Sequence, residues 1–323
     1  MGAAHRKPYP DPKHENCPGG GASTGLVLGT DFISDVLLIS IRVDAPVTLI
    51  PGLLATDVAL RTMSEALTKA ACTILELEAT ELQAEYRPAL TAAGRDGREA
   101  EIYIYDTLPG GAGFARRVGQ LGLTVFEEAL RVLADCPDDC DRSCYRCLRS
   151  YRNKFEHDLL DRQVSESLLK YLLHGDEPTL RPGRLEASTD LLFQDLQRHN
   201  LEGLTIQRSV PLTIPGLGSV TSPIHITRAQ DGSEFVIGLH SPLTPDHPSD
   251  PALQELKEFG AVEGGSKRRR GGRVAAVQFG GAHECSPVRR QDGEPFPDLT
   301  PLLRKALECD PTWSSGETFA DRC

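Results

Sequence analysis

The sequence predicts a protein of the α/β (α+β) class, built from two mixed domains in succession. The chain has 323 residues, which is enough for two hydrophobic cores. Apolar residues recur at every second position in some segments and at every third or fourth in others, as in strands and amphipathic helices. The polar stretch HGDEPTLRPGR at 174–184 separates the two series of elements, and we place the domain boundary there.

The first domain is expected over residues 25–176, after a polar, flexible leader at 1–24. The segment DFISDVLLISIRV at 31–43 places its apolar residues on one face in a period-two pattern, which predicts a buried strand. Residues 56–77 carry apolar side chains at spacings of three and four, which predicts an amphipathic helix with Thr56 as its cap.

Further along this domain, Thr124 and Glu127 have the spacing of a capping box for a helix at 125–134. The other elements expected are a turn at 94–99, a strand at 101–107, a helix after the glycines at 110–113, a helix ending near Phe155, and a helix at 161–173.

The second domain, expected over 185–285, is predicted to contain a helix at 189–199, strands at 204–214, 223–228 and 234–240, a helix at 251–259, a basic loop at 264–273 and a strand at 273–279. The tail at 286–323 is expected to be irregular apart from a short helix at 302–307. This order of elements resembles the restriction-endonuclease-like core.

Active members of that fold hold magnesium with an acidic residue near the second strand and a Glu/Asp-x-Lys on the third. The corresponding stretches here, PIHIT and FVIGLH, supply neither. The resemblance therefore implies an inactive nuclease fold that serves as a binding module. His225 and His240 are expected to be ordinary strand histidines.

The overall charge excludes one function class and leaves another open. A net charge of −11 argues against coating nucleic acid over the whole surface, but a local basic patch remains compatible with it. The sequence has neither an apolar run long enough to span a membrane nor a secretory signal, so we expect a cytoplasmic protein. In that compartment, clustered cysteines favour metal or redox chemistry over disulfides.

Four cysteines fall within twelve positions, in the pattern Cys136-x3-Cys140-x3-Cys144-x2-Cys147. The residues between them are polar and turn-forming, which suits four thiolates around one tetrahedral zinc ion. An iron–sulfur cluster takes the same ligands, and a redox dithiol is a weaker alternative. A four-cysteine zinc site has no open position, so its expected role is to fold the domain.

The segment RCLRSYRNKFEHDLLDR follows at 146–162. In a helix, its residues Arg149, Asn153, His157 and Asp161 would share one face. One interpretation is a capping network in which His157 pairs with Asp161. The other is a nucleic-acid contact, with basic groups on phosphates and rings stacked on bases. The candidates for that contact are Arg146, Arg149, Tyr151, Arg152, Asn153 and His157, with Arg142 and Lys154 as further cations and Tyr145 and Phe155 as further rings.

Two other stretches are candidates for phosphate contacts. IYDTLPGGAGFARRV at 104–118 joins a strand to a helix through glycines, a junction that presents backbone amides to an anion. It is not a P-loop, and the chain shows no ATPase motif. The candidate residues in this stretch are Gly110, Gly111, Gly113, Arg116 and Arg117, and the alternative is a tight turn.

The second stretch is the basic loop at 264–273, with the candidates Lys267, Arg268, Arg269, Arg270 and Arg273. The alternative there is a solvated loop.

Three blocks carry a family resemblance: LGTDFISDVLLI, IYDTLPGGAGFARRV and SCYRCLRSYRNKFEHDLLDR, in this order. They resemble the MrfA-type zinc-binding domain of certain superfamily-two DNA helicases and of DrmB-like anti-phage defence proteins, over about residues 25–175. The resemblance implies that Cys136, Cys140, Cys144 and Cys147 bind zinc. It also implies that the domain assists a DNA-translocating ATPase in repair or defence.

The helicase cores of that family are missing from this sequence. We therefore expect the tail of a larger protein, a split-gene product, or a subunit that meets its helicase in trans. The function expected is that of a non-catalytic accessory domain that binds DNA, a helicase, or both. The alternatives are a metal-dependent nuclease with an unrecognised site and a scaffold that binds only protein.

Overall fold

The computed structural model describes residues 29, 31–88, 97–199, 201–214, 218–232, 234–244, 254, 256 and 273–278, the last stretch as backbone only. The chain divides into two compact units, Met1–Ile33 and Ser34–Cys323, and every element below lies in the second. The predicted leader, the tail with its short helix, and the lysine and arginines at 267–270 lie outside the described residues, as does nearly all of the helix expected at 251–259.

The first sheet is antiparallel and contains β1 (Val36–Arg42), β2 (Leu82–Pro88) and β3 (Glu99–Asp106) in the order β1-β3-β2. β1 and β3 confirm the strands expected from the period-two pattern. Their inward residues pair across the sheet, with Ile39 opposite Ile102. β2 was not expected, because LQAEYRP mixes short apolar and charged residues without a clear period.

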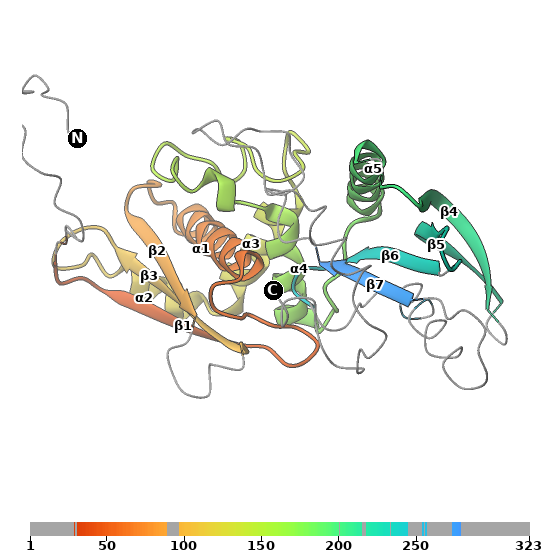
Figure 1. The fold of residues 1–323 in the computed structure, drawn as a ribbon. Helices are drawn as coiled ribbons and strands as arrows, with labels where there is room; N and C mark the ends of the chain where they lie inside the picture. Colours follow the sequence, from red (N-terminus) through yellow and green to blue (C-terminus); the bar gives the residue numbers. More distant parts are fainter. Residues whose placement is uncertain are drawn as a thin grey trace, which may run out of the picture. The chain divides into compact units, whose positions relative to one another are not determined.

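Four helices complete this half: α1 (Leu54–Leu75), α2 (Phe114–Leu121), α3 (Leu123–Ala134) and α4 (Arg162–His174). α1 lies along the sheet and also packs against α3 and α4 (Figure 1). Leu60, Met63 and Leu67 of α1 are fully buried together with Ile102 and Ile104 of β3. The expected helices at 56–77, 125–134 and 161–173 are confirmed.

The expected caps of two of these helices are wrong. α1 begins at Leu54, so Thr56 is already inside its first turn and is 1% exposed. α3 begins at Leu123 without a side-chain cap, because Gly122 makes the turn from α2 with a φ of 58°. Thr124 therefore lies within the helix and forms no capping box. A conformation that glycine adopts freely has replaced the side-chain hydrogen bond.

The helix expected to end near Phe155 is also wrong. The chain from 144 to 156 forms successive turns, and a short 3₁₀ turn, η2 (His157–Leu159), follows them. Side chains take over the hydrogen bonds that a helix would make: the amide of Ser150 donates to Asn153 Oδ1 at 2.8 Å. Such local side-chain bonds compete with helix formation. The stripe of side chains predicted on that helix therefore does not exist.

The second half contains α5 (Pro182–Arg198), β4 (Leu204–Ile214), β5 (Gly218–Arg228), β6 (Glu234–His240) and β7 (Arg273–Gln278). The strands form one sheet in the order β4-β5-β6-β7, antiparallel except for the parallel pair β6–β7. α5 starts earlier than expected, because Pro182 suits the first turn of a helix. The predicted strands are confirmed, while the restriction-endonuclease-like assignment stays a prediction.

The segment after β6 contributes to the core of the first half. Leu243 is fully buried in the same cluster as the α1 side chains, and its carbonyl accepts the amide of Thr48 at 2.9 Å. No helix in the described stretches combines the length and the apolarity that crossing a membrane requires.

Candidate metal centre and the adjoining loop

The four clustered cysteines converge just after α3. The Sγ–Sγ distances are 3.5 Å for Cys136–Cys140 and 3.6 Å for both Cys136–Cys144 and Cys140–Cys147, and all four sulfurs lie within 4.8 Å of one another. Four sulfurs bound tetrahedrally to zinc at about 2.3 Å would lie about 3.8 Å apart. A disulfide would instead bring two of them to about 2.05 Å. The residues therefore fit a four-thiolate zinc centre.

Two of the thiols differ in the direction in which their surroundings shift the pKa. Burial acts to raise the pKa of Cys136, but the backbone amides of Cys140 and Asp138 and the neighbouring thiols bring that pKa down to about 6. Burial and the thiols of Cys136 and Cys147 raise the pKa of Cys140 above its ordinary value. Because a metal binds thiolates, zinc binding displaces the remaining protons from the cluster.

Arg162, the first residue of α4, binds the backbone around the cysteines. Its guanidinium donates to the carbonyls of Leu133 at 3.0 Å, Ala134 at 2.9 Å and Cys140 at 2.6 Å, and pairs with Asp139 at 3.0 Å. Arg162 is 1% exposed. It thus satisfies the carbonyls at the end of α3 and fixes the cysteine loop to α4. The sequence carried no signal for this role, because the acceptors are backbone atoms.

Asp161 caps α4 and connects it to two arginines. Its Oδ1 accepts the amides of Gln163 and Val164, and its carboxylate binds Arg184 of α5 through two hydrogen bonds of 2.8 and 2.5 Å. Nε of Arg142, in the cysteine loop, lies 3.4 Å from Asp161 Oδ2. The expected pairing of Asp161 with His157 is wrong.

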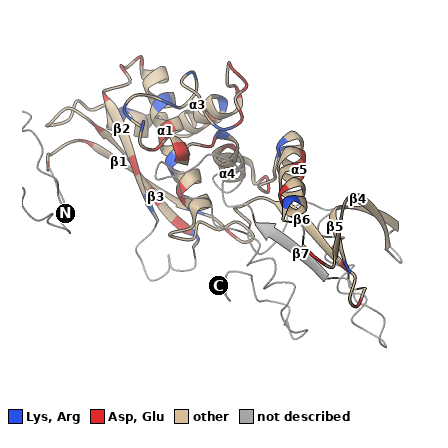
Figure 2. Ribbon diagram, turned by 45° about the horizontal axis from the view of Figure 1, so that its top comes forward, with Lys and Arg blue, Asp and Glu red and all other residues tan. Residues whose placement is uncertain are grey.

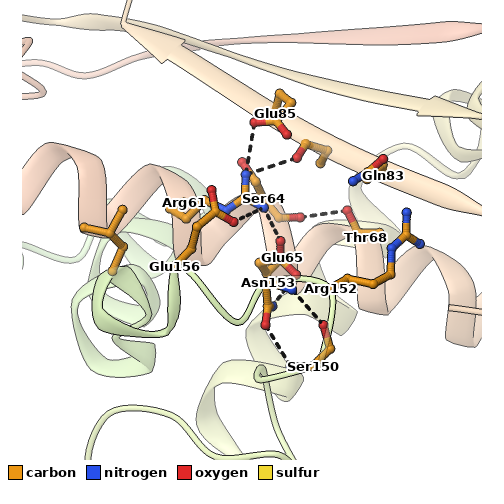
Figure 3. Close-up of polar contacts among 12 residues, drawn as sticks. Arg61, Ser64, Glu65, Thr68, Gln83, Glu85, Ser150, Arg152, Asn153 and Glu156 are labelled. Atoms are coloured by element: carbon orange, nitrogen blue, oxygen red, sulfur yellow. Dashed lines mark hydrogen bonds and ion pairs between the residues drawn. The ribbon is translucent and has the colours of Figure 1, made fainter. Parts of the chain in front are cut away.

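A short loop after the cysteines, residues 150–156, is anchored to α1; we call it the tip loop. Asn153 is 3% exposed and donates to Glu65 at 2.9 Å and to the carbonyl of Leu148 at 3.0 Å. Glu156 pairs with the buried Arg61 at 3.0 Å. Figure 3 shows Arg61 among the carboxylates of Glu65, Glu85 and Glu156, with Asn153 beside Glu65. α1 therefore fixes the inner side of the tip loop.

The outer side of the tip loop carries rings and cations. Tyr151 is 78% and Phe155 89% exposed. The Lys154 ammonium lies 4.2 Å from the centroid of the Tyr151 ring and 4.9 Å from that of Phe155. From 142 to 155 the sequence contains five basic residues and no acidic one. The loop thus presents a basic and aromatic surface.

The predicted nucleic-acid candidates in this region separate into three groups by exposure. Arg146, Tyr151 and Arg152 are exposed. Arg149 is half-buried and donates to Ser143 Oγ at 2.9 Å. Asn153 and His157 point inward: Nε2 of His157 lies 3.0 Å from both the Ser150 carbonyl and Asn153 Oδ1. The burial of Asn153 makes it an anchor of the loop and argues against a direct contact with DNA.

At the glycine-rich junction, the protein supplies its own anions. Asp106, fully buried at the end of β3, accepts the amides of Ala112 at 2.6 Å, Phe114 at 3.1 Å and Ala115 at 2.7 Å. Asp35 accepts the amide of Gly113 at 3.0 Å. These amides are the groups that would have bound a phosphate.

The phosphate contact expected of Gly110, Gly111 and Gly113 stays a prediction, and an anion there would have to compete with these two carboxylates. A Cβ on Gly111 would lie 2.4 Å from the Asp35 carboxylate, so this glycine serves close packing. Arg116 and Arg117 remain exposed on α2. An aspartate that ends a strand just before a glycine-rich helix start was the signal in the sequence for this internal cap.

A mixed α+β domain that closes four cysteines into one tetrahedral site is, as a class, a zinc-binding domain with a structural metal. Residues 63–148 match the family model of MZB, the MrfA Zn-binding domain. The chain therefore carries an MrfA-type zinc-binding domain, which confirms the resemblance seen in the sequence.

Two further comparisons concern larger proteins. The chain is 33% identical over 183 residues to the Druantia protein DruE of Escherichia coli (strain UMEA 4076-1), a match that covers 54% of this chain and 10% of that protein. The chain thus spans about a tenth of the length of this relative. It also matches the crystal structure of the DUF1998 helicase MrfA bound to DNA, with 18% identity and a TM-score of 0.27, over 36% of this chain and 14% of that one. A TM-score this low carries no argument about the fold.

Proposed function

We propose that this chain is a non-catalytic, zinc-stabilised accessory module of a superfamily-two DNA helicase system in DNA repair or anti-phage defence. It contributes DNA binding, helicase binding, or both. The observation that carries the proposal is the closed four-cysteine centre of an MrfA-type domain, followed directly by an anchored loop with a basic and aromatic outer surface. The similarity to a Druantia protein supports the defence context.

The chemistry of the centre supports a non-catalytic role. When bound, zinc stabilises the fold as a fourfold link between cysteines. Cys136, Cys140, Cys144 and Cys147 fill all four positions of a tetrahedral ion, which leaves none for water or substrate. The sequence contains no nucleotide-binding P-loop either. The motor of such a system is then a helicase domain in cis or a separate subunit in trans.

The test measures both binding activities on the zinc-loaded full chain. Fluorescence anisotropy with labelled DNA at several salt concentrations measures DNA affinity, which we expect to fall as salt rises. Co-purification with a superfamily-two helicase of the same genome measures partner binding. A zinc-loaded, folded protein that binds neither DNA nor helicase would contradict the proposal.

One observation favours a second candidate, a metal-dependent nuclease. The second half has the element order of the restriction-endonuclease-like core, with a sheet of order β4-β5-β6-β7. Within β5 and β6 the one carboxylate is that of Glu234, 3.8 Å from His225, and no lysine follows it at the spacing that the nuclease motif requires. We therefore expect no cleavage of plasmid or single-stranded DNA with magnesium or manganese. Cleavage that Glu234→Gln abolishes would favour the nuclease instead.

A further inference from the structure

We infer that the tip loop is a stacking site for unpaired bases of single-stranded DNA, in which Tyr151 and Phe155 supply the stacking faces and Lys154 binds a phosphate beside them. This inference rests on the proposed DNA-binding function and specifies its substrate class.

The exposed rings are the first observation. Tyr145, Tyr151 and Phe155 are 69%, 78% and 89% exposed, and they are three of the four large aromatic side chains that lie exposed in the described part of the chain. Aromatic rings normally supply a large share of the buried apolar area. A group of them held in water within one short segment indicates a surface that a partner covers.

Charge indicates the chemistry of that partner. Lys154 lies over both rings of the tip loop and contacts the Tyr151 hydroxyl at 3.1 Å. Arg146 and Arg152 are exposed nearby in sequence; Arg146 also pairs with Asp138 at 3.6 Å, and Arg152 donates to the Ala79 carbonyl at 3.2 Å. The stretch 142–155 itself contains no carboxylate. An anionic partner with flat apolar groups matches both features. Nucleic acid combines phosphates and bases in this way.

The anchoring of the loop makes the surface ready for binding. Asn153 and Glu156 hold the backbone against Glu65 and Arg61, while the side chains between and beside them point outward. Because the loop is already ordered, binding does not have to order it. Such pre-organisation lowers the entropic cost of association.

The geometry favours unpaired bases over duplex DNA. In a duplex, the base faces are covered by their stacked neighbours, and only the edges are open in the grooves. The tip loop presents exposed rings on a turn rather than on a helix that could enter a groove. Rings of this kind stack on bases that are already unstacked, as along a separated strand.

The experiment compares strands that differ only in their bases. The zinc-loaded full chain is titrated into labelled oligothymidylate, into an abasic strand of the same length, and into a duplex, with anisotropy as the readout. The test variants are the double substitution Tyr151→Leu/Phe155→Leu and the single substitution Lys154→Gln. Matched controls are Leu123→Ala, an exposed apolar residue of α3, and Lys170→Gln, a partly exposed lysine of α4 that pairs with Glu166 at 2.8 Å.

We expect the wild-type chain to prefer oligothymidylate to both other ligands. The double variant should lose oligothymidylate affinity by about five- to a hundred-fold while binding the abasic strand as before, because each stacked base contributes through its ring partner. Lys154→Gln should lower the slope of log affinity against log salt by roughly 0.7. The two controls should bind like the wild type. Zinc content and circular dichroism establish that all variants are folded.

Four results would overturn the inference. If the wild type binds base-bearing and abasic strands equally, or if the double variant keeps its preference, stacking is wrong although DNA binding stands. If the double variant loses helicase co-purification and keeps its DNA affinity, the tip loop docks a protein, and the proposed accessory function still stands. If the zinc-loaded chain binds no nucleic acid, the inference fails, and helicase co-purification decides whether the proposed function survives.

Discussion

At the scale of single residues, three buried polar side chains organise the metal-binding half by binding groups other than the metal. Arg162 satisfies carbonyls at the end of α3, Asp106 satisfies amides at the start of α2, and Asn153 fixes the tip loop. An unpaired buried polar group costs much more than a paired one contributes, so each position tolerates little change. The four cysteines were predictable from their spacing. The role of Asp106 had a local signal, an aspartate just before a glycine-rich helix start, whereas the roles of Arg162 and Asn153 had none, because their partners are brought together only by the fold.

Arg162→Met should destabilise the protein by about 2–4 kcal/mol, because it keeps the side-chain length but leaves the carbonyls of Leu133, Ala134 and Cys140 without their donor. Urea unfolding measures the change. Arg116→Met, at an exposed position of α2, is the control and should stay close to the wild type. Equal stability of the two variants would show that water replaces the guanidinium.

Cys144→Ser should abolish stoichiometric zinc binding and lower the melting temperature, because three thiolates and a hydroxyl bind zinc far more weakly than four thiolates. Elemental mass spectrometry measures the metal content. The control is Cys72→Ala, which removes a buried thiol of α1 outside the cluster and should leave about one zinc per chain. Iron in the wild-type protein would show that the site holds an iron–sulfur cluster and not zinc. A folded, metal-free wild type would refute the metal centre.

Tyr86 should ionise at unusually high pH. Burial, and then the adjacent Asp57 carboxylate, raise its pKa to about 12 from an ordinary value of 10. The folded state therefore holds this proton more tightly than the unfolded state. Tyr86 contributes full stability below about pH 10, and the contribution is lost as the pH rises toward 12. The tyrosinate absorbance of the wild type minus that of Tyr86→Phe measures the titration, and a midpoint near 10 would contradict the burial.

At the scale of elements, the periodicity of apolar residues predicted the helices and strands that pack into the core. It failed where side-chain hydrogen bonds replace those of a regular backbone. β1 and β3 followed from apolar alternation, and the helix expected at 161–173 is α4. The tip loop did not follow, because its bonds reach Glu65 and Arg61, far away in sequence. A helical reading of 146–155 was locally reasonable. It was wrong because Asn153 bonds to Ser150 and to α1 rather than pointing into solvent.

Asp106→Asn should loosen the junction of β3 and α2. An asparagine keeps one oxygen acceptor, but its NH₂ group replaces the second carboxylate oxygen. That NH₂ group would face a backbone N–H, so two donors would meet and one hydrogen bond would be lost. We expect a loss of about 1–3 kcal/mol in the free energy of unfolding. Urea denaturation checks this against Asp190→Asn, a half-exposed partner of Arg208. A phosphate-dependent gain in the stability of the wild type would instead support the anion site at the glycines.

At the scale of the whole molecule, the helices of the described part mix basic and acidic residues rather than segregating them. Figure 2 shows basic and acidic segments side by side around α1, α3 and α5, in keeping with the net charge of −11. Long-range attraction to DNA is therefore weak, and a DNA contact has to be local and short-ranged. The order of elements was largely predictable from the sequence. The packing of Leu243 into the core of the first half was not predictable, because nothing in the local sequence marks a single leucine as a long-range contact.

Removal of zinc by a chelator should reach beyond the cysteines. Cys147 and Leu148 belong to the same buried cluster as Leu243, so loosening the centre should also weaken the bond between the Thr48 amide and the Leu243 carbonyl. Hydrogen exchange should accelerate at residues 136–147 and at Thr48, with less change in β4 and β5. Protection of Thr48 that persists after complete zinc removal would show that the two regions are uncoupled.

The tip loop alternates side chains that hold it with side chains that face solvent, and this arrangement separates stability from specificity. Cys147, Asn153 and Glu156 fix the backbone, whereas Tyr151, Lys154 and Phe155 are exposed and Arg152 adds one hydrogen bond, to the Ala79 carbonyl at 3.2 Å. The outward set can therefore diverge at little cost to folding. A combinatorial library randomised at those four positions, with the anchors kept, should yield folded zinc proteins with altered ligand preference. The specificity of the loop could then be changed independently of its fold.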